Sequence, residues 1–553
     1  MKAPSPIRPD KLPLLPALSA LIWFWLALTP SLLPRPALLQ GVLCAVAALI
    51  GYALGSIADW ALGSTGLKLS DKQRRLARRA LLGLAVVGTV AMLIFNTLWQ
   101  GKLRDAVGAA GIGISYFPVL LVVALVLFAL ILIISRSLRA AGRGLGRRLA
   151  KRVPRRLAGV LAAVLVLLLS YGAFNRVLVD NVVERLDASF MVINQEFSTD
   201  RPAPTSEFLS AGPNSGVKWK SLGRQGRVFI SNAPSAEQIS AFSGEPALQP
   251  VRAYVGVGTD GDVDLRNEVD QAVAELDRLG GFGRAVLNVA TGTGRGWVNE
   301  NQAQALEYMW GGDTATVSLQ YSYLPSWMSF LADGDRSQQA GRLLFEAVYA
   351  KWLTLPEDAR PRLVVSGESL GSFGGEAAFS GAQDLRERTS GALFVGPTAN
   401  NRLWSQFTQE RDPGSPEIAP IYRGGETVRF SADGKNWPGD SVTWEGSRVG
   451  YLQHSNDPVT WWDWGLAFNK PDWLIEKRGE NLRPYMTWLP VITMLQVGAD
   501  QAMANNVPVG QGHLFGTAPV YGWAQILPSE GWTTADSDRL AEVIEKRVAE
   551  LPS

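Results

Sequence analysis

The sequence is poor in the residues that build disulfides and metal centres. Its 553 residues include one cysteine, Cys44, and two histidines, His454 and His513. A single cysteine excludes an intramolecular disulfide and a cysteine metal cluster, and two histidines exclude a histidine-rich metal site. We therefore expect no metal and no other cofactor, so that any chemistry has to come from ordinary side chains.

Ionisable side chains are missing from five apolar stretches in the first third of the chain. Each stretch is about as long as a bilayer crossing requires, and they lie at Leu12–Leu33, Ala37–Ile57, Ala80–Trp99, Tyr116–Ser135 and Leu157–Asn175. We interpret the first as an uncleaved anchor, because no small-x-small cleavage site precedes Arg35. Transport pathways usually need an ionisable group at membrane depth. Residues 1–175 are therefore predicted to be a five-helix transmembrane module that anchors the chain or faces lipid.

Basic residues are distributed unevenly between these stretches. Three occur in the first eleven residues, six in the segment 68–79 and nine in the segment 136–156. The alternate loops carry only Arg35 in one case and Lys102 with Arg104 in the other. The positive-inside rule then predicts a cytoplasmic N-terminus and an extracytoplasmic location for everything after the fifth stretch. The segment 136–156 is basic enough for a nucleic acid, but beside a membrane span we favour a topogenic role with anionic-lipid contact, and we expect no nucleic-acid partner.

Beyond the apolar stretches the pattern changes to alternating strands and helices. An exit helix at Arg176–Glu196 and a linker rich in Pro, Ser and Gly at Ser198–Gly216 make up a connecting region, 176–217, before a domain at 218–553. The domain pattern predicts a mainly parallel sheet flanked by helices. The predicted strands are Arg252–Val257, Ala285–Ala290, Ala315–Gln320, the run into Ser369, Ala392–Val395 and Arg448–Leu452, and the predicted helices include Glu268–Leu279 and Gln338–Leu353. Residues 398–446 are rich in Trp, Pro and Gly and are interpreted as an irregular insertion.

One turn organises this domain. Val364 and Val365 lead into Gly367-Glu368-Ser369-Leu370-Gly371, and a helix-compatible stretch follows at once. In a nucleophile elbow the serine occupies a strained tip, and Gly367 and Gly371 are small because strand and helix nearly touch there. The G-x-S-x-G spacing alone is a weak signal, and its plain alternative is a glycine turn after a core strand. The strand–turn–helix context favours Ser369 as a nucleophile.

The order of the remaining candidates follows from that hypothesis. In α/β-hydrolases an acid and then a histidine follow the nucleophilic serine along the chain. Asp457 comes just after a predicted strand, and His513 lies in a late loop 56 residues further on. Asp463 is a rival acid within the intervening insertion. His454 is a rival base, but it precedes the acid at a strand end, so we interpret it as a supporting residue.

An oxyanion site needs two backbone amides. The first should be the amide of Leu370, directly after the nucleophile, and the second should come from the glycine-rich loop that contains Gly292, Thr293 and Gly294. The same loop could suggest a phosphate cradle. It lacks the full G-x-G-x-x-G pattern, because Trp297 stands in place of the third glycine.

Further motifs occur along the whole chain. They are Ser31-Leu32-Leu33-Pro34-Arg35, Thr293-Gly294-Arg295-Gly296-Trp297-Val298, Gln320-Tyr321-Ser322-Tyr323-Leu324-Pro325-Ser326-Trp327, Arg411-Asp412-Pro413-Gly414-Ser415-Pro416-Glu417, Leu452-Gln453-His454 through Asp457-Pro458, and Gly512-His513. With the Gly367–Gly371 turn, they resemble bacterial membrane-bound α/β-hydrolases that pair an N-terminal multi-span module with an extracytoplasmic hydrolase domain. The resemblance implies a serine-hydrolase fold and a membrane location, and it implies no particular substrate. One departure is Phe515, where the family pattern leads us to expect tyrosine.

These observations predict a multi-pass protein of the cell (inner) membrane with its catalytic domain on the extracytoplasmic side. We expect an esterase, lipase or acyltransferase that forms an acyl-enzyme with a lipid or cell-envelope ester. The tryptophans could form an acyl or sugar pocket or could serve packing, and they are Trp404, Trp437, Trp444, Trp461, Trp462, Trp464 and Trp473. The alternative function is a non-catalytic envelope scaffold or sensor that retains the hydrolase fold. The intact order of serine, acid and histidine argues against it.

Overall fold

The chain forms two compact units. The computed structural model describes residues 13–64, 70–174, 201–257, 264–323, 326–439, 442–479, 482 and 486–550. The first unit comprises Met1–Glu184, Trp464–Leu474 and Leu482–Pro508, and the second comprises Arg185–Asp463, Ile475–Asn481 and Val509–Ser553. Two segments near the C-terminus, within the expected hydrolase domain, therefore belong to the N-terminal unit.

The first unit is helical. Its N-terminal helices are α1 (Leu14–Leu26), α2 (Ala37–Gly63), α3 (Asp71–Ala106), α4 (Tyr116–Leu149) and α5 (Arg155–Phe174). By length and composition α2, α3 and α4 can each cross a membrane, whereas the apolar parts of α1 and α5 are shorter. Large apolar side chains on α3 and α4 are exposed, such as Val87 (70%) and Leu125 (68%). That surface suits a lipid environment and not water.

The first apolar stretch, predicted as one span over Leu12–Leu33, is not a continuous helix. α1 ends at Leu26, and the chain then passes through Pro30 and Pro34 before α2 begins. Both prolines lack an amide hydrogen and disfavour helix in the residue before them. A distant carboxylate stabilises the break, because the amides of Leu32 and Leu33 donate to Asp500 Oδ2 at 3.0 and 3.2 Å.

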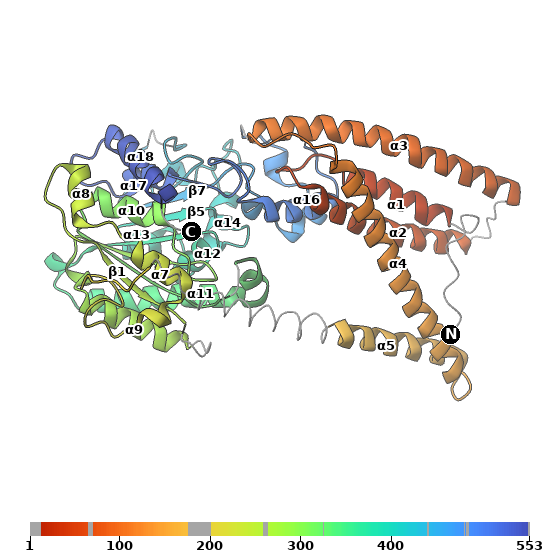
Figure 1. Ribbon diagram of the computed structural model, residues 1–553, viewed down its shortest axis with the longest axis horizontal. Coiled ribbons are helices and arrows are strands. Elements are labelled where there is room, and N and C mark those ends of the chain that lie inside the picture. The colour runs from red at the N-terminus through yellow and green to blue at the C-terminus, as the bar shows by residue number, and fades with distance from the viewer. Residues whose placement is uncertain are drawn as a thin grey trace. The chain divides into compact units, whose positions relative to one another are not determined.

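The same carboxylate forms a buried ion pair with Arg35. Arg35 Nη1 lies 2.7 Å from Asp500 Oδ1, and both side chains are fully buried. Arg35 also donates to Ser31 Oγ at 2.8 Å and to Gln40 Oε1 at 2.9 Å. Asp500 is the last residue of α16 (Ile492–Asp500), which lies beside α1 and α2 in Figure 1 and contributes Ile492 to their apolar core. The motif Ser31–Arg35 thus joins the N-terminal helices to a segment more than 450 residues later.

The second unit is built on a seven-stranded parallel sheet. Its strands are β1 (Val251–Val255), β2 (Val286–Thr291), β3 (Thr314–Leu319), β4 (Arg362–Glu368), β5 (Gly391–Val395), β6 (Val428–Ser431) and β7 (Arg448–Leu452), in the order β1-β3-β2-β4-β5-β7-β6. Every neighbouring pair is parallel. Six strands lie where the sequence predicts them, and the predicted fold class is confirmed.

Helices cover both faces of this sheet, as Figure 1 shows. One layer contains α9 (Leu265–Arg278), α11 (Ser326–Leu353) and α12 (Leu370–Gly375), and the other contains α8 (Ala236–Ser243), α10 (Glu300–Met309), α17 (Ala518–Ile526) and α18 (Thr534–Glu550). Shorter helices are α7 (Gly223–Ser231), α13 (Ala382–Arg388), α14 (Arg402–Gln409) and α15 (Pro458–Trp461). The second layer packs a core of strand residues such as Val364 and Leu393 against Trp523 and Leu540.

Two segments differ from their sequence interpretation. The predicted linker packs onto β1, because Ser210 and Phe208 exchange backbone hydrogen bonds with Arg252 at 3.0 and 3.1 Å. The α/β unit therefore begins before residue 218. The region 398–446 is not wholly irregular, since it contains α14 and β6. The predicted exit helix at Arg176–Glu196 lies outside the described residues.

The buried ion pair gives a stability prediction for the first unit. Asp500→Asn leaves the Arg35 guanidinium buried without a countercharge, which costs about 3–5 kcal/mol in comparable pairs. We expect a clear fall in the thermal unfolding midpoint of the full-length protein in detergent. The control is Asp277→Asn, which breaks the half-exposed Lys351–Asp277 pair of 3.0 Å and should cost no more than about 1 kcal/mol. Equal shifts for the two variants would contradict the assigned role of Arg35 and Asp500.

Candidate active site

Four neighbouring strands end at one edge of the sheet. β2, β4, β5 and β7 are consecutive and parallel, so their carboxyl ends meet at the same edge, where ligands bind in open α/β sheets. The amide of Ser369 donates to Val395 O at 2.9 Å, and the amide of Gly396 donates to Leu452 O at 2.8 Å. These bonds extend the register of the sheet past the strand ends and bring the candidate residues to adjacent loops.

Ser369 occupies a strained turn between β4 and α12. Its φ of 54° and ψ of −121° lie in a region that residues with side chains rarely adopt. A Cβ on Gly367 would lie 2.3 Å from Gly371 O, and one on Gly371 would lie 2.3 Å from Thr291 O. The two flanking glycines are thus required by backbone contact, as the elbow hypothesis expects.

His513 and Asp457 form a buried pair. His513 Nδ1 lies 2.6 Å from Asp457 Oδ2, and Asp457 is fully buried. Asp457 is the N-cap residue of α15, where its Oδ1 accepts the amide of Val459 at 2.9 Å. The carboxylate is therefore fixed by its own helix before it meets the imidazole.

The loops that carry the pair are joined by further hydrogen bonds. Gly512 donates its amide to Asn456 Oδ1 at 3.0 Å, and Asn456 Nδ2 donates to Gln511 Oε1 at 2.8 Å. His454 Nδ1 lies 2.9 Å from Gly512 O, so this nitrogen donates, and the ring stacks on Phe515 at 4.2 Å. Burial lowers the pKa of His454. His454, the rival base, therefore supports the loop that carries His513.

The imidazole of His513 lies against the end of β5. A Cβ on Gly396, whose φ is +52°, would lie 2.4 Å from His513 Cε1. Ser369 bonds to the preceding residue, Val395. The serine and the imidazole therefore each contact one of two consecutive residues at the end of β5. His513 Nε2 is buried and has no hydrogen-bond partner within the described part of the chain, so it is available to a reacting hydroxyl. Gly396 is a site residue that the sequence interpretation missed.

Electrostatics favour the protonated form of His513. Burial alone lowers its pKa, but the Asp457 charge and hydrogen bond, together with the Glu368 charge, outweigh burial and raise it. An imidazolium formed during a reaction would therefore be stabilised here.

Glu368 is the second site residue that the sequence missed. It is half-buried directly before Ser369 and accepts a hydrogen bond from Asn299, the N-cap residue of α10. Burial raises its pKa, and the nearby His513 and Asn299 lower it to a smaller extent. The G-x-S-x-G motif treats this position as variable, so the motif carried no signal for it.

The glycine-rich loop after β2 is a tight turn. The amide of Thr293 donates to Trp297 O at 2.9 Å, and that of Gly296 donates to Thr293 O at 2.7 Å. The amide of Thr293 is therefore engaged within the loop, which disfavours it as an oxyanion donor. The amides of Gly292 and Gly294 remain candidates. Leu370 begins α12, where the first amides have no acceptor within the helix.

Comparison with protein families agrees with this geometry. The Alpha/beta-hydrolase family matches residues 251–540, and the N-terminus of an Alpha/beta-hydrolase family matches residues 28–234. The first match alone covers more than half of the chain. The chain belongs to the Alpha/beta-hydrolase family. No curated protein and no solved structure matches it.

Other candidates in this α/β-hydrolase lie outside the His513–Asp457 pair. Asp463, the rival acid, is six residues beyond Asp457, and it is Asp457 that contacts the imidazole of His513. Of the seven tryptophans considered for an acyl or sugar pocket, four are buried, namely Trp404, Trp437, Trp461 and Trp473. Trp404 donates to Gln453 at 2.6 Å and packs edge-on against Trp461, which favours packing over a pocket. Within the described residues, no group of three His, Cys, Asp or Glu is placed to bind a metal ion.

Positive charge lies beside the glycine-rich loop of this α/β-hydrolase. Gly226 of α7 packs on the ring of Tyr254, whose hydroxyl donates to Gly296 O at 2.9 Å. Tyr254 thereby connects the helix that carries Arg224 to the loop that carries Arg295. The pKa of Arg295 is lowered, first by burial and then by the charge of Arg224.

The position of Glu368 predicts a shift in the titration of His513. Glu368→Gln removes a negative charge that stabilises the imidazolium, so the pKa of His513 should fall. Because the chain has only two histidines, selective ¹⁵N-histidine labelling resolves both rings in an NMR pH titration. His454 should change little, and the exposed Glu357→Gln control should leave both rings unchanged. An unchanged or higher pKa for His513 in Glu368→Gln would contradict the assigned contact.

Proposed function

We propose that the protein is a serine hydrolase that cleaves or transfers the acyl group of a carboxylic ester. The observation that carries this proposal is the 2.6 Å contact between His513 Nδ1 and Asp457 Oδ2, at the sheet edge where Ser369 occupies its strained turn. A carboxylate on one imidazole nitrogen leaves the other nitrogen as a base for a serine hydroxyl. Family membership supports a hydrolase fold and agrees with this assignment.

The reaction would follow from these positions. Ser369 Oγ attacks the ester carbonyl while its proton passes to His513 Nε2, and Asp457 stabilises the resulting imidazolium. The tetrahedral oxyanion accepts hydrogen bonds from the amide of Leu370 and from that of Gly292 or Gly294. The carbon–oxygen bond to the alcohol then breaks, and His513 returns the proton to the leaving oxygen. Water or a second alcohol attacks the acyl-enzyme with the same base, which regenerates Ser369.

We propose a lipid or cell-envelope ester as the substrate class. The apolar helices α2, α3 and α4 fit a membrane protein. In a membrane the protein would be surrounded by ester lipids, which makes them suitable substrates. Because His513 acts as a base only when neutral, activity should be lost as the pH falls through its raised pKa.

The central prediction concerns the nucleophile. Ser369→Ala should abolish labelling by a fluorophosphonate probe and reduce turnover of a soluble ester by about 10⁴-fold, because the three residues act in one step. His513→Ala should lose nearly as much, since the serine hydroxyl then stays protonated. His454→Ala should cost only about tenfold, because that ring supports the loop and does not act on substrate.

The matched control is Ser380→Ala, which removes an exposed serine eleven residues after Ser369. This variant should label and turn over like the unchanged protein. Turnover retained in Ser369→Ala would overturn the serine mechanism. A greater loss in His454→Ala than in His513→Ala would reverse the assignment of the base. Failure of the unchanged protein to label would favour the non-catalytic scaffold.

We further propose that the α/β unit lies on the extracytoplasmic side of a cell membrane. The two strongly basic segments lie at the far ends of helices that begin near Arg35. Segment 68–79 comes after α2, and segment 136–156 comprises the last turns of α4 and the turn into α5. Asp500 pairs with Arg35 at the opposite end. The segment that carries Asp500 is inserted between parts of the α/β unit in the sequence. It therefore joins the first unit at the end poor in unpaired basic charge, which the positive-inside rule assigns to the outside.

Cysteine labelling in cells tests this orientation. In a Cys44→Ala background, Thr205→Cys before the α/β unit should react with a membrane-impermeant maleimide. Lys72→Cys near the start of α3 should react only after the cells are permeabilised. Both positions are exposed in the structure, so burial in the protein cannot explain a cysteine that does not react. The reverse labelling pattern would invert the proposed topology.

A further inference from the structure

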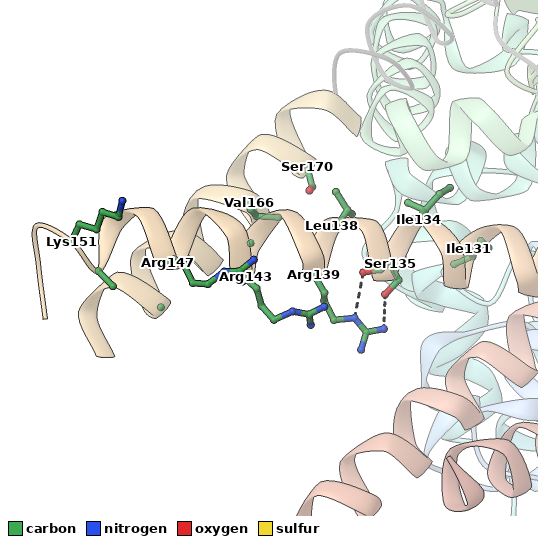
Figure 2. A pocket seen from close by; sticks show the side chains of 14 residues that line it. Ile131, Ile134, Ser135, Leu138, Arg139, Arg143, Arg147, Lys151, Val166 and Ser170 are labelled. Atoms are coloured by element: carbon green, nitrogen blue, oxygen red, sulfur yellow. Dashed lines mark hydrogen bonds between the residues drawn. The ribbon is translucent and has the colours of Figure 1, made fainter. Parts of the chain in front are cut away.

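A long groove runs between α4 and α5 within the first unit. It has a volume of about 1230 Å³ and is lined by residues of α4 from Ile131 to Arg147, by Ala150 and Lys151 just after α4, and by Gly159, Val166 and Ser170 of α5. Figure 2 shows the two helices side by side, with the lining side chains along the groove. At a rise of ~1.5 Å per residue, the α4 part from Ile131 to Arg147 spans about 24 Å. A groove of this length can accommodate an extended molecule.

The lining changes in chemistry along the groove. One end is apolar and is formed by Ile131, Ile134 and Leu138 of α4, whereas Val166 of α5 lies further along, against Gly142. The other end carries basic side chains at four-residue intervals, namely Arg139, Arg143, Arg147 and Lys151. This spacing places the three arginines on one face of α4, and Lys151 follows the end of that helix. The groove is thus amphipathic along its length, with cationic and apolar ends.

The protein offers little countercharge to this row. The sequence contains no Asp or Glu between Asp105 and Asp180. Within the described part of the chain, none of the four cations forms a salt bridge. Arg139 bonds to Ser135 of its own helix, at 2.9 Å to Oγ and 3.3 Å to the carbonyl oxygen. Like charges four residues apart repel, so an external anion would stabilise the row.

Small residues open the groove beside the cations. Gly142 and Gly146 alternate with the basic residues on α4, and Gly159 faces them from α5. A Cβ on Gly142 would meet only Val166 Cγ2, at 3.7 Å. The groove therefore has open space beside Gly142, next to Arg143, whereas Gly146 lies against Ala158 and Ala162 of α5.

The apolar end favours a lipid over a soluble anion. α4 exposes large apolar side chains such as Leu125 and Ile133 on its outer surface, so the apolar end opens toward hydrocarbon if α4 crosses the bilayer. Basic pockets between membrane helices are suited to anionic lipid headgroups. We propose that the α4–α5 groove binds an anionic phospholipid, with the phosphate at Arg143 and Arg147 and an acyl chain along Ile131, Ile134 and Leu138. This site is separate from the candidate active site and does not depend on the proposed catalysis.

Lipid titration of the full-length protein tests the proposal. In maltoside micelles, native mass spectrometry should show dioleoyl phosphatidylglycerol binding more tightly than dioleoyl phosphatidylcholine. The double variant Arg143→Gln/Arg147→Gln should weaken phosphatidylglycerol binding about thirtyfold, as expected for two cations near a headgroup. Binding of phosphatidylcholine should change little. The matched control Arg74→Gln/Arg75→Gln removes two exposed arginines of α3 outside the groove and should leave both lipids unaffected.

A second variant tests the apolar part without changing charge. Gly142→Leu fills the groove and should weaken phosphatidylglycerol binding at least about tenfold, which is a loss of ~1.4 kcal/mol. Inorganic phosphate should not compete at concentrations that match the lipid. The proposal is overturned if the control double variant loses as much affinity as Arg143→Gln/Arg147→Gln. It is also overturned if Gly142→Leu binds normally or if inorganic phosphate displaces the lipid. Either result would indicate that the headgroup is attracted to surface charge and that the lipid does not occupy the groove.

Discussion

The candidate site depends on one buried hydrogen bond, between His513 and Asp457. Its 2.6 Å length and the full burial of the carboxylate mean that neither partner can be removed without leaving the other unsatisfied. Asn456 and His454 fix the two loops on either side of the bond. Ser369 gains its position independently, from the ends of β4 and β5. The site is therefore assembled from a rigid sheet edge and a pair of loops that stabilise each other.

The chain between the acid and the base has an unusual course. After Asp457 it enters the first unit at Trp464–Leu474 and again at Leu482–Pro508, before it returns with Val509 to reach His513. Within the first unit this segment contains α16, whose last residue, Asp500, pairs with Arg35. The 56-residue gap between the acid and the base is thus occupied by a segment that builds the helical unit. The sequence interpretation recognised an insertion and did not foresee its place.

Local signals explain what the sequence could predict. The parallel sheet follows from short β-branched runs between helical segments, and the elbow follows from glycines whose backbones touch. β6 was missed because its four residues include Arg429, whose buried guanidinium donates to the carbonyl oxygens of Gly425 and Val442 and packs on Trp444. Pro30 is a local signal that the first apolar stretch is shortened, but the carboxylate that stabilises the break, Asp500, lies hundreds of residues away. Contacts of that kind leave no pattern in a local window.

The structure of a covalent adduct tests the central claim most directly. After reaction of the full-length protein with an alkyl fluorophosphonate, the account predicts phosphorus bonded to Ser369 Oγ. His513 Nε2 should lie within hydrogen-bond distance of the adduct, and the phosphoryl oxygen should accept the amide of Leu370 and that of Gly292 or Gly294. An adduct on another residue, or a phosphoryl oxygen directed away from these amides, would contradict the proposed catalytic site.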